Sequence, residues 1–288
     1  MECQIGAVAV NYVEHGAGTP VLVLHGAGVD HREAEACFEP ALRARDGYRR
    51  IYPDLPGLGR TPAPPSLRSA DDVLQTLLGF VDWVSGHDAL LVVGHSAGAY
   101  YAQGIAACRP NQVAGLALVC PLLAEVRDVP AHHPVVVADD LGDDEFRNYF
   151  VVQTPEMLDR YQQFVAPAIP LADNAAMQRI GRQWELSNPE GPPYGGAVLV
   201  IAGRQDATVG YAAATDLLEQ FPRATLAVLD GAGHALPHEQ PELLAGLIGD
   251  WLGRAAVGRT EPLTHSGRLA LLRMMRVRPV TTGPPAGT

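Results

Sequence analysis

Lysine is absent from the 288-residue sequence, and all 21 basic residues are arginine. With 32 aspartates and glutamates the net charge is −11, but its distribution is uneven: the first 253 residues carry −16 and the last 35 carry +5. Because a strongly acidic surface repels phosphate backbones, we expect no nucleic-acid partner for the body of the protein. Only the arginine-rich tail, 256–288, is expected to attract anions.

Cysteine is scarce as well. The four cysteines have no CxxC spacing and no neighbouring histidine cluster, so we expect buried free thiols and no metal site. No apolar run approaches the roughly 18 residues that cross a bilayer, and the N-terminus lacks a basic segment followed by an apolar one. These absences predict a cytoplasmic protein without stable membrane insertion, and no motif in the sequence calls for a cofactor.

Short apolar segments alternate with longer segments of helical period along most of the chain. Hydrophobic residues make up 47% of the sequence, which is enough for a large core. This alternation is typical of an α/β fold with a mostly parallel central sheet flanked by helices. The expected strands are 7–13, 21–26, 49–55, 89–94, 113–120, 197–203 and 224–230, and the expected helices are 31–45, 69–85, 97–109, 210–220 and 239–254.

The alternation stops after Cys120. We interpret 121–195 as a helical cap inserted into a core formed by 1–120 and 196–255, because ligands of parallel sheets bind at the carboxyl ends of the strands, where such an insertion would form a lid. A separate helical domain is the alternative. Helices are expected over 140–152, over 154–167, with Thr154 as N-cap and Pro155 in the first turn, and over 171–187.

A possible nucleophile follows the fourth predicted strand, in "LLVVGHSAGAYY" (90–101). The pattern Gly-x-Ser-x-Gly places a serine on a tight strand-to-helix turn, and the two glycines allow strand and helix to approach closely. Gly94 and Gly98 flank Ser96 in this way. An ordinary strand-to-helix turn is the alternative, so the remaining parts of a catalytic site are needed to decide.

A serine hydroxyl requires a base, and the base requires an acid that holds its tautomer. Asp206 follows strand 197–203 in "GRQD", and His234 follows strand 224–230 in "GAGHALPHEQP". Each alone would be an ordinary turn residue, but together with Ser96 they occupy three strand ends in the order serine, acid, histidine. Glu125 and Asp128, after strand 113–120, are the alternative acids.

The loop "HGAG" at the end of the second strand offers backbone N–H groups to a developing oxyanion. The donors are expected to be the amides of Ala27 and of Ala97, which directly follows Ser96. A tight turn without catalytic function is the alternative for this loop.

With these motifs the sequence resembles the α/β-hydrolase superfamily, in its serine-nucleophile branch with a helical cap. The matching features are "HGAG", "DLPGLGRT" (54–61), "GHSAG", "GRQD" and "GAGHALPHEQP", spread over 7–254 apart from the cap. The resemblance implies Ser96 as nucleophile, Asp206 as acid, His234 as base, and Ala27 and Ala97 as oxyanion-hole donors. Asp54–Gly59 is a structural turn in such proteins, and Thr61 stands where serine is commoner.

The predicted function is a serine hydrolase that cleaves an ester, lactone or related acyl substrate through an acyl-enzyme. A serine rather than an aspartate at position 96 disfavours the epoxide hydrolases and haloalkane dehalogenases of this fold. Because several cap residues are aromatic, we expect a small acyl substrate with an apolar part. Candidate substrate contacts are Gly26, His95, Tyr149 and Trp184.

Three alternatives remain at this stage. Arg179 and Arg182 in the cap would suit a carbon–carbon bond hydrolase that binds a carboxylate, although Ala235 stands where those enzymes usually carry an aromatic residue. An acyltransferase would use the same residues. A binding protein that has lost the chemistry is the third. The tail segment "GRLALLRMMRVR" (267–278) is expected either to pack on the acidic body or to contact an anionic membrane or partner.

Overall fold

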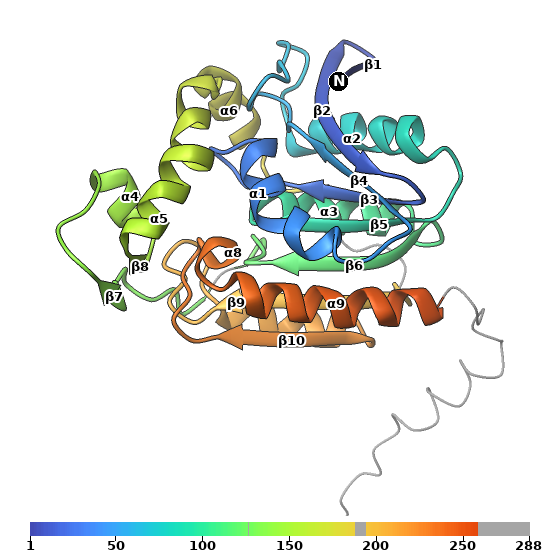
Figure 1. Cartoon of the computed structure of the whole chain (residues 1–288). Coiled ribbons are helices and arrows are strands. Elements are labelled where there is room, and N and C mark those ends of the chain that lie inside the picture. Colours follow the sequence, from blue (N-terminus) through green and yellow to red (C-terminus); the bar gives the residue numbers. More distant parts are fainter. Residues whose placement is uncertain (126, 188–193, 259–288) are drawn as a thin grey trace, which may run out of the picture.

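An eight-stranded sheet forms the centre of the computed structural model, which describes residues 1–125, 127–187 and 194–258 (Figure 1). The strand order is β1-β2-β4-β3-β5-β6-β9-β10, with antiparallel pairing of β1 to β2 and of β2 to β4 and parallel pairing of all the others. The strands are β1 (Glu2–Ile5), β2 (Val8–Gly16), β3 (Thr19–Leu24), β4 (Tyr48–Pro53), β5 (Leu90–His95), β6 (Val113–Val119), β9 (Ala197–Gly203) and β10 (Ala224–Leu229). The predicted α/β class with a mostly parallel sheet is confirmed.

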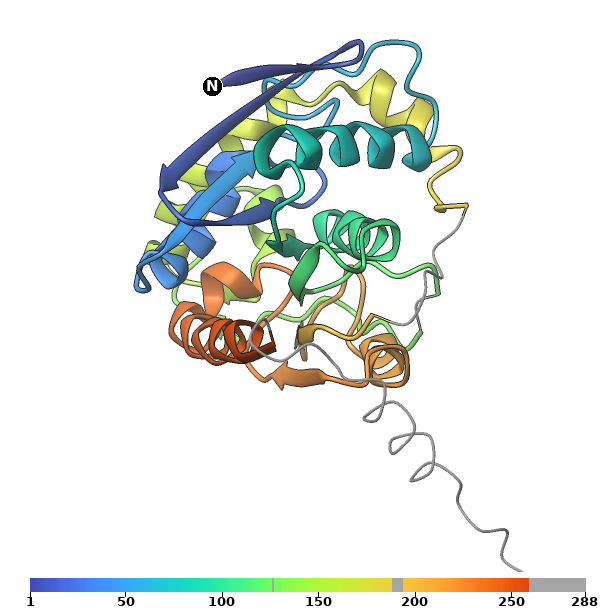
Figure 2. The same ribbon diagram turned by 90° about the vertical axis from the view of Figure 1, so that its right-hand side faces the viewer.

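Helices cover both faces of the sheet because alternate strand side chains point to opposite sides. In β3, Leu22 and Leu24 belong to the cluster under α2 (Ala70–Ser85) and α3 (Ala97–Cys108). Val21 and Val23 belong to the cluster under α1 (His31–Leu42) and α9 (Pro241–Gly258). Figure 2 shows these two helical layers on either side of the sheet. The short helices η3 (Ala212–Asp216), α7 (Leu217–Gln220) and α8 (Leu236–Glu239) complete the core.

Local capping explains where the long helices begin. Asp30 caps α1 by accepting a hydrogen bond from the Arg32 amide, as its side-chain chemistry predicts. Ser69 and Asp72 form a reciprocal capping box at the start of α2. Each of these helices therefore starts at a defined residue at one end of the sheet.

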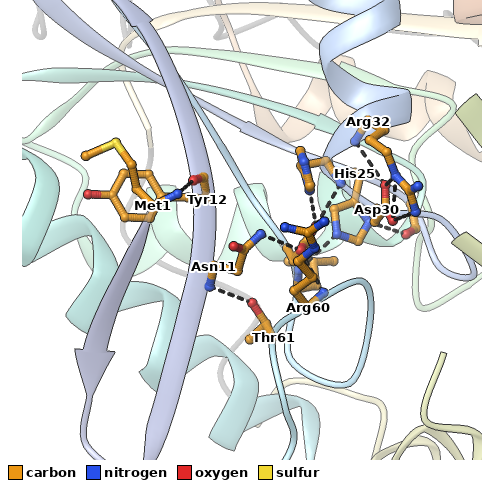
Figure 3. Close-up of polar contacts among 12 residues, drawn as sticks. Met1, Asn11, Tyr12, His25, Asp30, Arg32, Arg60 and Thr61 are labelled. Atoms are coloured by element: carbon orange, nitrogen blue, oxygen red, sulfur yellow. Dashed lines mark hydrogen bonds and ion pairs between the residues drawn. The ribbon is translucent and has the colours of Figure 1, made fainter. Parts of the chain in front are cut away.

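The turn after β4 is tied to its surroundings by Asp54, which is fully buried. One carboxylate oxygen accepts from the backbone and ring of His31, and the other accepts from the side chain of Asn11 and the amide of Arg60. The hydroxyl of Thr61 accepts from the Asn11 amide, as Figure 3 shows together with the Asp30–Arg32 contact. The predicted structural turn Asp54–Gly59, with the two residues that follow it, thus joins β2, β4 and α1.

The residues between β6 and β9 lie at the carboxyl ends of the central strands (Figure 1). Thr154 caps α5 as predicted. Phe146, Phe150 and Tyr161 pack together with Val29 and Ala235 from the core, so this segment has a hydrophobic cluster of its own. Its elements are β7 (Val136–Val137), α4 (Asp144–Tyr149), β8 (Val152–Gln153), α5 (Pro155–Arg160), the π-helical turn η1 (Tyr161–Val165), the 3-10 helix η2 (Ala166–Leu171) and α6 (Asn174–Gly181).

Some predicted boundaries were wrong. No strand was predicted before residue 7, but β1 pairs with β2 at the antiparallel edge of the sheet. The helix predicted over 154–167 changes at Tyr161 into π-helical and then 3-10 geometry, because prolines 167 and 170 cannot donate helical hydrogen bonds. The predicted tail segment 267–278 lies outside the described residues. Within the described part of the chain, no helix has the length and apolar character needed to cross a membrane.

Candidate active site

Ser96 occupies a sharp turn between β5 and α3. Its backbone angles are φ 54° and ψ −119°, a conformation that non-glycine residues rarely adopt. A Cβ on Gly94 would lie 2.4 Å from the Gly98 carbonyl oxygen, and one on Gly98 would lie 2.3 Å from that of Leu24. Both flanking positions therefore require glycine, and the turn lifts the Ser96 side chain above the end of the sheet.

The side chains of Ser96, His234 and Asp206 form one hydrogen-bonded chain. Nε2 of His234 lies 2.9 Å from Oγ of Ser96, and Nδ1 lies 2.9 Å from Oδ2 of Asp206. Because a carboxylate accepts, Nδ1 carries the proton and Nε2 is free to accept from the serine hydroxyl. The structure thus brings together the three residues that the sequence selected from three separate strand ends.

Asp206 is completely buried, and the second oxygen of its carboxylate is also occupied. Oδ1 accepts from the amides of Thr208 and Val209 at 2.9 and 3.0 Å. Burial by itself would raise the pKa of Asp206, but the hydrogen bond and charge of His234 and the two amides bring it below its ordinary value. The carboxylate is therefore ionised and fixed, as a partner that orients His234 must be.

The loop after β3 lies against the serine and is braced by His25. Its Nε2 accepts from the Leu55 amide at 2.9 Å, so Nδ1 carries the proton and donates to the Gly26 carbonyl at 2.7 Å. The Gly26 carbonyl and the Ala27 N–H belong to one planar peptide unit and point in opposite directions. His25 therefore fixes the direction of the Ala27 N–H.

Neither Ala27 nor Ala97 donates its amide to an acceptor among the described residues. Ala97 begins α3, where the first amides lack intrahelical partners and the helix dipole favours negative charge. Both predicted donor amides are therefore free to donate to a group bound beside Ser96. Gly26 also lies here, since a Cβ on it would come within 3.2 Å of the Ser96 Cβ and 3.4 Å of Nδ1 of His95.

The other predicted contact residues divide into two groups. Tyr149 of α4 lies over the site, with its ring centroid 6.4 Å from that of His234, and His95 donates from Nε2 to the His234 carbonyl at 3.0 Å. Trp184 packs instead on the ring of Tyr100 at 5.7 Å, beside the cluster under α2 and α3. A substrate contact by Trp184 stays a prediction.

A buried polar chain beside the site was missed from the sequence. Glu33 of α1 accepts from the Tyr149 hydroxyl at 2.6 Å and lies 3.3 Å from Nε2 of His238. Arg160 of α5 donates to Nδ1 of His238 at 3.0 Å, so Nε2 carries the proton and donates to Glu33. This chain connects the segment 121–195 to the core. The only sequence signal was an acidic residue in the expected helix 31–45 that stands four positions before Cys37, and therefore on the same face of the helix as that cysteine.

Glu239 is a second buried carboxylate with no predicted role. It accepts from the Gly233 amide at 2.7 Å through one oxygen and from the amides of Val151 and Val152 at 2.7 and 3.2 Å through the other. It thereby holds the residue before His234 and the backbone at the start of β8. The sequence placed Glu239 in the motif "GAGHALPHEQP", but nothing in the motif identified its partners.

The alternative acids do not reach the site. Glu125 and Asp128 are exposed, whereas Asp206 contacts His234 directly. Arg179, proposed as a carboxylate-binding residue, donates to the backbone carbonyls of Leu67, Ala63 and Pro64, and Arg182 is exposed.

In the part of the chain that the structure describes, two groups of side chains have the spacing of metal ligands. In the first, Asp30, His31 and Asp54 are already joined to Arg32, to each other or to backbone amides. In the second, His95 and Cys120 accompany His234, whose two nitrogens contact Ser96 and Asp206. Their hydrogen bonds account for both groups, so we assign neither to a metal.

Comparison with known proteins identifies relatives over most of the chain. The model of the Alpha/beta hydrolase family matches residues 21–247. The magnesium-chelatase 30 kDa subunit of Rhodobacter capsulatus is 28% identical over 268 residues, covering 82% of this chain and 87% of the relative. The 2-hydroxy-6-oxo-6-(2'-aminophenyl)hexa-2,4-dienoic acid hydrolase of Metapseudomonas resinovorans is 26% identical, covering 87% and 90%. An alpha/beta superfamily hydrolase from Oenococcus oeni PSU-1 superimposes with a TM-score of 0.80 at 26% identity, covering 89% of this chain and 99% of that one.

Proposed function

The chain belongs to the alpha/beta hydrolase family, and from this membership and the geometry of Ser96 we propose that it is a serine hydrolase acting on an ester, lactone or related acyl substrate. The observation that supports this proposal most directly is the hydrogen-bonded chain from Ser96 through His234 to Asp206. The sequence-based expectation of an α/β-hydrolase fold is confirmed by the family match and the superposition.

In the proposed reaction, Nε2 of His234 accepts the Ser96 proton while Oγ attacks the acyl carbonyl carbon. The developing oxyanion accepts hydrogen bonds from the Ala27 and Ala97 amides. Asp206 stabilises the imidazolium that forms. His234 then donates its proton to the leaving group, and the bond between the acyl carbon and that group breaks.

In the second half of the proposed reaction, His234 accepts a proton from water as its oxygen attacks the acyl carbon. The bond between that carbon and Oγ of Ser96 then breaks, His234 returns the proton to Oγ, and the acid leaves. Replacement of water by another acceptor would make the same site an acyltransferase. Each step uses only side chains and amides of this chain. The small-molecule substrate would enter beneath the segment 121–195, where Tyr149 and neighbouring aromatic side chains give the site an apolar wall.

Hydrolysis of a carbon–carbon bond is the second candidate, because the relative from Metapseudomonas resinovorans aligns over 87% of this chain and is named as a dienoic acid hydrolase. The acyl assignment is preferred because Arg179, the cap residue best suited to bind a substrate carboxylate, is engaged by backbone carbonyls. A substrate panel that includes that dienoic acid separates the two activities.

The first prediction concerns Ser96→Ala. We expect it to reduce the hydrolysis of a panel of p-nitrophenyl esters, lactones and thioesters by at least about a thousandfold, since no nucleophile remains. It should also abolish labelling by a fluorophosphonate. Ser85→Ala is the matched control, because Ser85 is a buried serine at the end of α2 that donates to the Val81 carbonyl. An undiminished rate in Ser96→Ala would overturn the proposed function.

A further inference from the structure

Two acceptor atoms face each other beside the nucleophile. Oε2 of Glu33 lies 3.9 Å from Nδ1 of His95, and both side chains are 3% exposed. Among the described residues, neither atom has a partner within hydrogen-bond distance. The hydrogen bonds of Glu33 all use Oε1, and that of His95 uses Nε2.

Both atoms carry lone pairs. Nε2 of His95 contacts a carbonyl oxygen, so it must donate, and Nδ1 is left unprotonated. Burial lowers the pKa of His95 to about 4, which keeps the ring neutral at physiological pH. Burial raises the pKa of Glu33, but the hydrogen bonds that its carboxylate accepts from His238 and Tyr149 lower it below its ordinary value, so the carboxylate is ionised. A lone pair and an anionic oxygen that face each other require a donor between them.

Among the residues that the structure describes, no permanently charged side chain contacts the Glu33 carboxylate directly. His238 donates to it as a neutral ring, because Nδ1 of that ring accepts from Arg160. The positive charge of Arg160 is thus separated from the carboxylate by the width of an imidazole. A buried carboxylate is stabilised most by a cation that also donates hydrogen bonds to it.

One atom of the pair lies close to the nucleophile. A Cβ built on Gly26 would lie 3.4 Å from Nδ1 of His95 and 3.7 Å from Oγ of Ser96, so both atoms lie next to this glycine. Tyr149, which donates to Glu33, has its ring centroid 6.4 Å from that of His234. A polar group bound beside the carbonyl that Ser96 attacks would therefore lie near the pair.

We propose that Glu33 and His95 form a subsite for a primary ammonium group on the acyl substrate. If an ammonium nitrogen lies about 2.8 Å from both acceptors, the angle between the two acceptors at that nitrogen is roughly 90°. Two N–H bonds of a tetrahedral ammonium can point toward acceptors at this angle. A hydroxyl group has a single hydrogen and satisfies only one of the two. This proposal rests on the proposed function, and it narrows the substrate to amino-acyl esters or related amino-acyl compounds.

The experiment compares p-nitrophenyl esters that differ only by an ammonium in place of a methyl group: glycine with propanoate, 3-aminopropanoate with butanoate, and 6-aminohexanoate with heptanoate. Rates are divided by spontaneous hydrolysis measured with Ser96→Ala. For the chain length that reaches the subsite, we expect kcat/KM of the ammonium ester to exceed that of its methyl partner by roughly ten- to a hundredfold. The N-trimethylated ester, which keeps the charge but has no N–H, should lose most of that preference.

Glu33→Gln tests the residue itself. The side-chain oxygen of the new glutamine can still accept from Tyr149 and His238. Its NH₂ group then takes the place of Oε2 and faces Nδ1 of His95 as a donor, so the site no longer has two acceptors for an ammonium group. We expect the ratio of kcat/KM between the ammonium ester and its methyl partner to fall to about one in this variant. Glu35→Gln, on the same helix, is the matched control because it removes one charge from a partly exposed side chain, and it should keep the preference.

Equal rates for all ester pairs in the unmodified protein would overturn the subsite and leave the proposed function intact. A preference that survives in Glu33→Gln would overturn it as well. If the protein hydrolyses none of the esters and no fluorophosphonate reacts at Ser96, the proposed function fails, and the subsite fails with it.

Discussion

At the scale of single residues, the site depends on backbone positions that leave no space for a side chain. Ser96 adopts a positive φ, and the two glycines beside it contact backbone carbonyl oxygens across the turn. The sequence predicted this turn from Gly-x-Ser-x-Gly together with Asp206 and His234 at two later strand ends, because the pattern alone left an ordinary strand-to-helix turn open. It did not predict the partners of His25 or Glu33, because those contacts join residues from different elements.

Gly98→Ala is expected to destabilise the protein by about 1–3 kcal/mol, because the new Cβ would meet the Leu24 carbonyl oxygen at 2.3 Å. Gly246→Ala is the control: Gly246 lies in α9 with no atom within 4 Å of a built Cβ, so alanine should stabilise the helix by up to about 1 kcal/mol. Urea unfolding measures both. Equal effects of the two substitutions would contradict the close approach at Ser96.

Stability in acid should report on Glu33. The pKa of Glu33 in the folded protein is lowered to about 2 from an ordinary value of 4.5. The ionised carboxylate therefore contributes fully to the free energy of unfolding above pH 4.5, and this contribution is lost as the pH falls toward 2. We expect Glu33→Gln to flatten the dependence of the unfolding free energy on pH over this window. Glu35→Gln provides the comparison, and an unchanged slope in Glu33→Gln would show that the carboxylate is not held ionised by its neighbours.

At the scale of elements, the sequence predicted most of the strands and long helices but not how the segment 121–195 is attached. Periodicity and capping residues identified α1, α2 and α5 because these signals are local. The start of β8 is held by the side chain of Glu239, which lies almost 90 residues further along the chain. Such an attachment depends on the folded arrangement, and no pattern within either segment contains it.

Glu239→Gln should weaken this attachment, because an amide has only one acceptor oxygen and cannot serve both Gly233 and the amides of Val151 and Val152. We expect a loss of about 1.5–3 kcal/mol in unfolding free energy. A lower kcat with little change in KM should accompany it, because Gly233 precedes His234. Glu242→Gln, on the exposed side of α9, should change neither quantity.

At the scale of the whole molecule, the model of the alpha/beta hydrolase family matches residues 21–247, so the arginine-rich tail lies outside the part of the chain that the family shares. A chain that ends at Gly258 should therefore keep its thermal unfolding temperature and its ester hydrolysis, while its net charge changes from −11 to −15. Binding to anionic vesicles, compared between the two chains, tests the predicted attraction of the arginine-rich tail to anions. A large fall in unfolding temperature would show that the tail belongs to the core.

The positions of the site residues along the chain also concern its synthesis. Gly26, Ser96, Asp206 and His234 come from loops at the ends of β3, β5, β9 and β10, and Glu239 completes their arrangement. A ribosome makes the serine long before it makes the histidine, so the nascent chain carries an unactivated hydroxyl while the next 138 residues are added. Because no piece that ends before Glu239 contains the whole proposed site, the return of hydrolysis after dilution from denaturant would count only molecules in which these distant segments have come together.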